Sequence, residues 1–143
     1  MAKQEPTDEK KAKVQQKYMM LQMIEGQMKE MQEEMEKIDM RAKELASMKN
    51  SLADFENTKS GAKSLASLGM GVYAESEIRN TKEVFVNVGA GVVVQKPAAE
   101  TSKVLDKQIE SVSEVTEQLT QNLQALAQRA GQLQEELQAL VKE

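Results

Sequence analysis

The sequence predicts a mainly α-helical protein with a small β segment. Two long helices are expected to form an antiparallel coiled coil, with β-hairpins between them. Apolar residues recur at alternating three- and four-residue steps in the first and last thirds of the chain, and such a stripe must be buried against a partner helix. The stretch between these stripes is instead rich in valine and glycine, a composition typical of strands and turns.

The first helix is expected over residues 7–59. Its stripe, which we call the N-terminal seam and which is apolar except at Lys17, consists of Val14, Lys17, Leu21, Ile24, Met28, Met31, Met35, Ile38, Ala42, Leu45, Met48, Leu52 and Phe55. Two successive three-residue steps around Met48 shift the register of the seam, and this shift is expected to overwind the supercoil locally. Gly61 follows the helix and offers the left-handed conformation that commonly ends one.

The centre of the chain, residues 60–96, is expected to hold four short strands. β-Branched residues alternate with others over residues 84–88, as in a strand with two different faces. Asn80 and Thr81 lie between two strand-like runs and are predicted to form a hairpin turn. Glycine pairs at positions 69 and 71, and at 89 and 91, are predicted to bend the strands sharply. We therefore expect two hairpin-like layers.

The second helix is expected over residues 97–142, with Pro97 in its first turn. Its stripe, the C-terminal seam, consists of Leu105, Ile109, Val112, Thr116, Leu119, Leu123, Leu126, Ala130, Leu133, Leu137 and Leu140. The two helices match closely in length, so they are expected to fold back on each other within one domain that spans residues 1–143. A long parallel dimer is the alternative, which the intervening β segment disfavours.

Composition excludes several classes of function. A net charge of −4 and a pI near 5.1 disfavour a nucleic-acid-binding protein. The absence of histidine and cysteine removes the commonest general base and the main zinc ligands, so no catalytic or metal site is predicted. The GxG fragments do not complete a dinucleotide fingerprint and no P-loop occurs, so no cofactor is expected. No apolar run is long enough to span a membrane, and a cytoplasmic location is expected.

Methionine is the most informative residue type. Of the ten methionines, eight fall between Met19 and Met48. Met19, Met20 and Met23, together with Tyr18, lie outside the N-terminal seam and extend the apolar surface around most of the helix. We call these four residues the methionine collar. Because flexible thioethers suit surfaces that accept many apolar shapes, the collar is predicted to be a promiscuous binding surface. A soft-metal site is the disfavoured alternative.

The strand segment poses a second question, because a small sheet from one chain has open edges and open edges promote aggregation. Two helices joined at one end cannot cover all of its apolar residues. Strands from several subunits are therefore expected to pair into a shared barrel or layered sheet.

Three segments of the centre resemble the central region of prefoldin α-class subunits. They are Leu68-Gly69-Met70-Gly71-Val72-Tyr73-Ala74-Glu75, Ile78-Arg79-Asn80-Thr81-Lys82-Glu83-Val84 and Asn87-Val88-Gly89-Ala90-Gly91-Val92. The β-class subunits have a shorter centre with one hairpin. Two departures stand out: the stretch from Lys63 to Leu68 lacks the family's usual proline, and Lys96-Pro97 replaces the usual Ser or Thr at the start of the second helix.

The resemblance implies an ATP-independent co-chaperone, a hexamer of two α and four β subunits with a double β-barrel body. The tips of its coiled coils would hold unfolded client proteins for transfer to a group II chaperonin. By position, the candidate client contacts are Tyr18, Met19, Met20, Met23, Leu133, Leu137, Leu140 and Val141. The candidates for oligomerisation are Val84, Phe85, Val86, Val88, Val92 and Val94. The alternative function is a structural coiled-coil spacer or filament former assembled through its β segment, and an enzyme is disfavoured.

Overall fold

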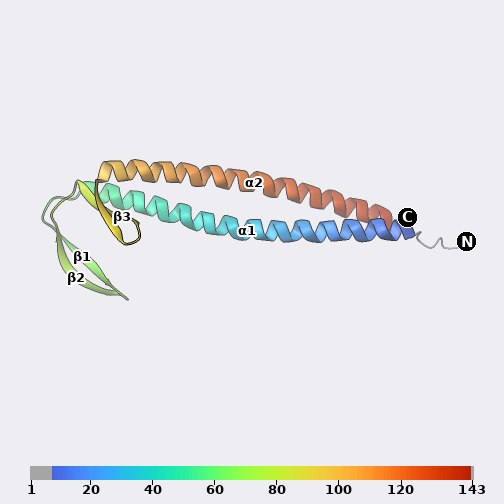
Figure 1. Ribbon diagram of the computed structural model, residues 1–143, viewed down its shortest axis with the longest axis horizontal. Helices are drawn as coiled ribbons and strands as arrows, with labels where there is room; N and C mark the ends of the chain where they lie inside the picture. The colour runs from blue at the N-terminus through green and yellow to red at the C-terminus, as the bar shows by residue number, and fades with distance from the viewer. Residues whose placement is uncertain (1–7, 143) are drawn as a thin grey trace, which may run out of the picture. The chain divides into compact units, whose positions relative to one another are not determined.

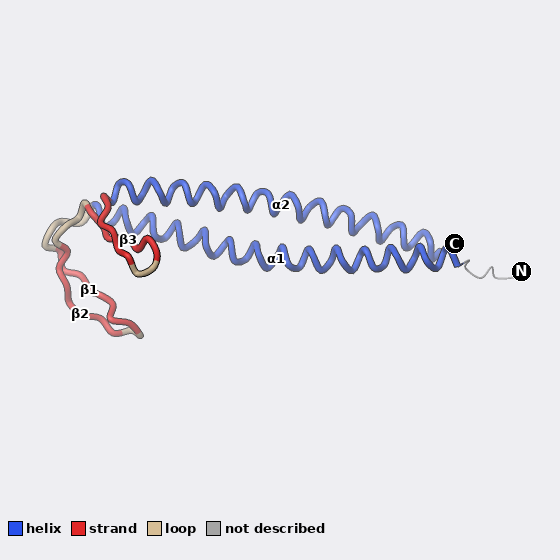
Figure 2. The backbone as a smooth tube through the Cα atoms, in the orientation of Figure 1, coloured by secondary structure: helices blue, strands red, loops and turns tan. Residues whose placement is uncertain are grey.

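The computed structural model describes residues 8–142 and confirms the predicted fold class. In chain order, one long helix precedes and another follows two antiparallel β-hairpins (Figures 1 and 2). The elements are α1 (Asp8–Glu56), β1 (Ala62–Gly69), β2 (Val72–Ile78), β3 (Glu83–Gly89), β4 (Val92–Pro97) and α2 (Ala98–Lys142). Residue 7, where the first helix was expected to begin, lies outside the described residues.

The contacts divide the chain into two compact units, and each helix contributes to both. The first unit combines Met1–Met40 with Glu114–Glu143, and the second unit is Arg41–Ser113. Within each unit, segments of α1 and α2 lie side by side (Figure 1). The second unit also holds both hairpins.

The core of the first unit is built from the two predicted seams. Leu21 and Ile24 of α1 and Leu133 of α2 are buried together, and partly buried seam residues of both helices surround them: Met28, Leu126, Ala130 and Leu137. Lys17 of α1 reaches Glu136 of α2, whereas residues further along α1 line a groove with earlier residues of α2, around Leu126. The two segments are therefore antiparallel, as the matched seams predict.

The second unit has a core of its own, formed by Leu45, Leu52, Ala98 and Leu105. One predicted seam member is wrong: Met48 is 53 % exposed and lies outside this core. The seven-residue step from Leu45 to Leu52 is two helical turns, so it keeps both residues on the buried stripe without Met48.

The adjoining position on α1 is occupied by Lys49. Its ammonium group lies 2.6 Å from Oδ1 of Asp106 on α2. This pair is half-exposed, so a charged residue can stand beside the seam without being desolvated.

Each hairpin closes through two residues with positive φ. β1 pairs with β2 and β3 with β4, leaving Met70-Gly71 and Ala90-Gly91 as the loops. Their φ angles are 50° and 81° in the first hairpin, and 52° and 76° in the second. This backbone is the type I′ turn, whose twist matches that of the strands it joins. Gly71 and Gly91 therefore lie in hairpin turns, whereas Gly69 and Gly89 are the last residues of β1 and β3.

The predicted hairpin turn at Asn80 and Thr81 is correspondingly wrong. Each hairpin forms its own two-stranded sheet, and the segment containing Asn80 connects the two. The side-chain Oδ1 of Asn80 accepts hydrogen bonds from the backbone N–H groups of Lys82 (2.9 Å) and Glu83 (3.1 Å). An asparagine side chain that accepts hydrogen bonds from the backbone N–H groups after it stabilises a turn, whether the turn lies within one hairpin or between two hairpins.

The two hairpins are built in the same way, 20 residues apart in the sequence. Gly69 in the first hairpin and Gly89 in the second occupy equivalent positions. Each of these glycines follows a residue that is skipped in the pairing of the two strands. The N–H of Gly69 donates to Oγ of Ser67 (3.3 Å), and the N–H of Gly89 donates to Oδ1 of Asn87 (2.9 Å). Such bulges increase the local twist of a hairpin.

Pro97 ends β4 instead of opening the second helix, which begins at Ala98. Pro97 lies opposite Glu83 in the strand pair, and its carbonyl accepts a hydrogen bond from Oγ1 of Thr101 (3.1 Å). The N–H of Ala98 donates to the carbonyl of Lys82 (2.7 Å). Since proline lacks an N–H, it suits the end of a two-stranded ladder. The turn into α2 is thus tied to the start of β3.

Candidate functional site

The methionine collar is an exposed apolar surface on α1. Tyr18, Met19 and Met23 are 53 %, 61 % and 61 % exposed, and Met20 is 36 % exposed. Met19 and Met23 are four residues apart and lie on the side of α1 away from the seam, because Leu21 and Ile24 face α2. The collar is therefore apolar surface that α2 does not cover.

The four predicted contacts on α2 do not form one surface. Leu133 is completely buried against Leu21 and Ile24, so it is a core residue in this conformation. Leu137 packs against the same core, and Leu140 is half-buried. Val141 is 75 % exposed. Only Val141 has the exposure of a collar residue, although Leu137 and Val141 together line a shallow hollow near the end of α2.

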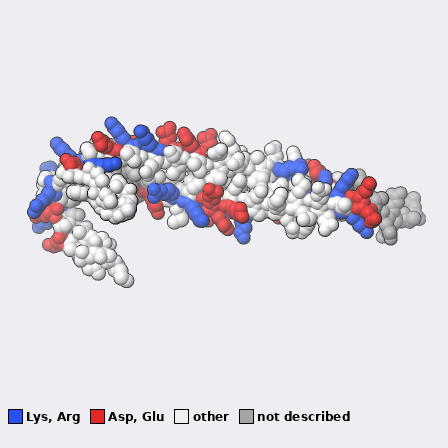
Figure 3. All heavy atoms as spheres, in the orientation of Figure 1, with Lys and Arg blue, Asp and Glu red and all other residues white. Residues whose placement is uncertain are grey.

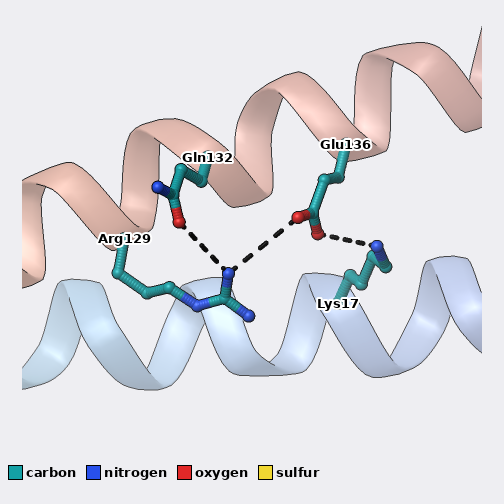
Figure 4. A network of polar contacts seen from close by, with 4 residues as sticks. All are labelled: Lys17, Arg129, Gln132 and Glu136. Carbon is teal, nitrogen blue, oxygen red and sulfur yellow. Dashed lines mark hydrogen bonds and ion pairs between the residues drawn. The ribbon is translucent and has the colours of Figure 1, made fainter.

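A polar network stands directly beside the collar and joins the two helices (Figure 4). The ammonium group of Lys17 donates a 2.6 Å hydrogen bond to Oε2 of Glu136, and Nη1 of Arg129 lies 3.9 Å from Oε1 of the same carboxylate. Arg129 also donates to Oε1 of Gln132 at 3.4 Å. The hydrogen bond from Lys17 and the positive charges of Lys17 and Arg129 lower the pKa of Glu136 from its ordinary value of 4.5, against a smaller opposing effect of burial. These contacts therefore favour the ionised form of the carboxylate.

The six predicted oligomerisation residues divide between the two faces of the second hairpin. Val84 packs against the core of the second unit and Val86 is half-buried, so this face rests partly on the helices. Phe85, on the other face, is 71 % exposed. The remaining three are also exposed: Val88, Val92 and Val94.

Sequence reasoning missed several exposed apolar residues of the hairpins. Val93 is opposite Asn87 and therefore shares the face of Phe85. In the first hairpin the missed residues are Leu65, Leu68, Met70, Val72 and Tyr73, all more than half exposed. Leu65 and Leu68 are three residues apart and Val72 and Tyr73 are adjacent, so these residues do not show the two-residue alternation that marks one face of a strand.

Charge is distributed unevenly over the molecule. Figure 3 shows side chains of both signs interspersed along the helices, whereas much of the first hairpin is uncharged. The sequence from residue 64 to 74 contains no charged residue.

In residues 8–142 there is no group of three acidic, histidine or cysteine side chains that could hold a metal ion. Over the same part of the chain, no helix is sufficiently long and apolar to cross a membrane.

Comparison with known proteins identifies the family. The sequence model described as Prefoldin subunit matches residues 24–143, which is most of the chain. The chain belongs to the prefoldin family. The predicted resemblance is thereby confirmed, and it supports a chaperone-type role.

Curated relatives point to the α class of prefoldin subunits. Prefoldin subunit alpha of Archaeoglobus fulgidus is 28 % identical over 106 residues, covering 74 % of this chain and 77 % of the relative. Prefoldin subunit alpha of Methanococcus aeolicus is 31 % identical over 99 residues, covering 69 % and 67 %. These relatives support assembly of the chain with other prefoldin subunits.

A solved structure shows that the fold is that of a prefoldin. The filamentous PFD from Methanocaldococcus jannaschii, determined by cryo-electron microscopy, superimposes with a TM-score of 0.71 at 18 % identity. The match covers 80 % of this chain and 95 % of that one. Two long helices separated by hairpins are thus the shared architecture.

The match to the prefoldin family begins after the collar. Tyr18, Met19, Met20 and Met23 precede residue 24, where the family match starts. The hairpins and the candidate contacts on α2 lie within the matched range. Membership of the family therefore assigns no role to the collar.

Proposed function

We propose that this chain is a subunit of an ATP-independent co-chaperone that binds non-native proteins and delivers them to a group II chaperonin. The observation that best supports client binding is the exposed collar. Three of its side chains are more than half exposed although α2 covers the adjoining seam. Exposed apolar groups gain free energy when a client covers them, and thioethers adapt to clients of different shape.

The polar network beside the collar supports this location. Lys17 and Glu136 hold α1 to α2 immediately before the first collar residue, Tyr18. The buried cluster of Leu21, Ile24 and Leu133 packs the two helices together, so the helix is held in place without using the collar side chains. Binding then requires no prior rearrangement of the helix pair, which lowers its conformational cost.

We also propose that the hairpins assemble the chain with β-type prefoldin subunits into a hetero-hexamer of two α and four β subunits. Each hairpin is a two-stranded sheet, and isolated two-stranded sheets are marginally stable in water. Exposed Phe85, Val88 and Val92 offer apolar surface to neighbouring subunits. A single prefoldin-like domain spanning residues 1–143 and a cytoplasmic location belong to this proposal.

The test is suppression of client aggregation by the assembled complex in the absence of ATP. Replacing Met19, Met20 and Met23 together by Gln should abolish most holding activity, because each Gln must lose hydration when an apolar client covers it. The control replaces Met40 and Met48 by Gln, since these methionines of α1 lie outside the collar and are 64 % and 53 % exposed. The control should retain activity. Full activity of the collar variant in an intact hexamer would refute client binding at the collar.

A filament-forming protein is the second candidate function. The similar solved structure is described as filamentous PFD, and exposed apolar hairpins can serve open-ended as well as closed assembly. Native mass spectrometry of the chain alone and with a β-type subunit distinguishes the two. A closed hexamer supports the co-chaperone, whereas growth without a defined end supports the filament.

A further inference from the structure

The methionines of α1 fall into two groups with different access to solvent. Met28, Met31 and Met35 are half-buried in the seam of the first unit. Met19 and Met23 are each 61 % exposed, on the other side of the helix. Solvent therefore reaches the thioethers of Met19 and Met23 more readily than those of Met28, Met31 and Met35.

The collar thioethers are also neighbours of one another. Met19 and Met23 are separated by one helical turn, and Met20 and Met23 by three residues, so the three side chains form one continuous patch. A chemical change at these three sulfur atoms would alter the patch as a whole. No seam contact would be altered directly, because the core of this unit is formed by other residues.

We propose that Met19, Met20 and Met23 form an oxidation site, at which hydrogen peroxide reversibly switches off client binding. This inference rests on the proposed function, because it assigns regulation to the same surface. In each step the sulfur lone pair attacks one peroxide oxygen, the O–O bond breaks and an S–O bond forms. The sulfur is oxidised by two electrons to a sulfoxide, and the peroxide is reduced to water.

Oxidation opposes client binding for a physical reason. A thioether is apolar and flexible, whereas a sulfoxide carries a polar S–O group that accepts hydrogen bonds from water. An apolar client segment would have to remove that water without replacing its hydrogen bonds. We therefore expect at least about tenfold weaker binding when all three residues are oxidised.

The helix pair itself should survive the modification. Leu21, Ile24 and Leu133 supply the buried core of the first unit, and none of them is oxidisable by peroxide. A thiol-dependent methionine sulfoxide reductase would restore the surface, since two thiols become a disulfide while the sulfoxide returns to thioether and releases water. The collar is thus placed for reversible control rather than for irreversible damage.

The experiment treats the assembled complex with hydrogen peroxide, maps sulfoxides by peptide mass spectrometry and measures client holding without ATP. We expect sulfoxides to accumulate at the collar before they appear at Met28 and Met31, with holding falling in parallel. Replacing all three collar methionines by Leu keeps an apolar surface without a sulfur atom. Client holding by this variant, measured relative to its own untreated sample, should not fall after peroxide treatment.

The matched control replaces three exposed methionines outside the collar, Met40, Met48 and Met70, by Leu. It should lose client holding on oxidation as the unmodified chain does. Circular dichroism and native mass, measured on every sample, show that the helices and the assembly persist. Recovery of activity with the reductase would support the switch.

Two results would overturn the inference. One is full client holding by the unmodified chain after mass spectrometry has shown sulfoxide at all three collar positions. The other is an equal loss of client holding by the collar Leu variant after peroxide treatment. That loss would show that oxidation of a residue outside the collar is responsible. Either result leaves client binding by the unoxidised collar intact, because the Gln variants described above test that binding without oxidant.

Discussion

Leu133 offers the sharpest test of whether a predicted contact residue of α2 serves helix packing or client binding. It is completely buried, and it packs against Leu21 and Ile24. Its position near the end of α2 also made it a candidate client contact. Truncation to alanine separates the two roles, because a core residue affects stability and a surface contact affects binding.

The expected cost follows from the atoms removed. Leu133→Ala deletes three carbon atoms from a fully buried side chain, which forfeits about 2.4 kcal/mol at about 0.8 kcal/mol for each buried carbon group. The cavity left between the helices adds to this cost. We therefore expect the free energy of unfolding to fall by about 2.5–4 kcal/mol.

Urea denaturation followed by far-ultraviolet circular dichroism measures the effect, at one fixed concentration of the assembled protein. Val141→Ala is the matched control, because Val141 lies on the same helix and is 75 % exposed. Its cost should be within about 0.5 kcal/mol of zero. A loss below about 1 kcal/mol for Leu133→Ala would refute the packing argument. Loss of client holding at unchanged stability would instead show that Leu133 contacts clients.

Three further changes test local features. Gly26→Ala should raise the free energy of unfolding by about 0.5–1 kcal/mol in thermal denaturation, because Gly26 lies within α1 and an added Cβ meets nothing within 4 Å; an unchanged or lower stability would contradict this. The same substitution at Gly89 should lower stability by about 1–2 kcal/mol, because its φ is 116°; a neutral result by the same assay would show that the turn relaxes. Glu136→Gln should lower the melting temperature at neutral pH. The lowered pKa of Glu136 means that its ion pair with Lys17 stabilises the fold above that pKa and is lost as the pH falls through it. The difference in melting temperature from the unmodified chain should therefore vanish in acid, and a difference that persists there would exclude the carboxylate as its cause.

The seams could be predicted because helical periodicity is a local property. Ile24, Leu45 and Leu105 each lie on a stripe that the spacing of apolar residues reveals, and each is buried. Met48 fitted the same spacing rule but is exposed. Both three- and four-residue steps satisfy that rule, so only the packing against α2 decides which of two neighbouring positions faces inward.

The hairpins show a second limit to what the sequence predicts about the fold. The β-branched residues around Val84 predict a strand, yet the pattern predicts a turn at Asn80 and none at Met70 or Ala90. Alanine and methionine disfavour positive φ, so neither residue marks a type I′ turn as Asn-Gly would. The following glycine in each loop and the cross-strand pairing impose the turn instead.

The amino-acid sequence by itself determined the two helices, the strand-rich centre and the apolar character of the collar, because each depends on residues close together in the chain. The tertiary structure decided which apolar residues are free. Leu133 and Leu140 both lie on the C-terminal seam, yet Leu133 is completely buried and Leu140 is only half-buried. Burial depends on what the partner helix places opposite each side chain, and that information lies more than 100 residues away in the sequence, at Leu21 and Ile24.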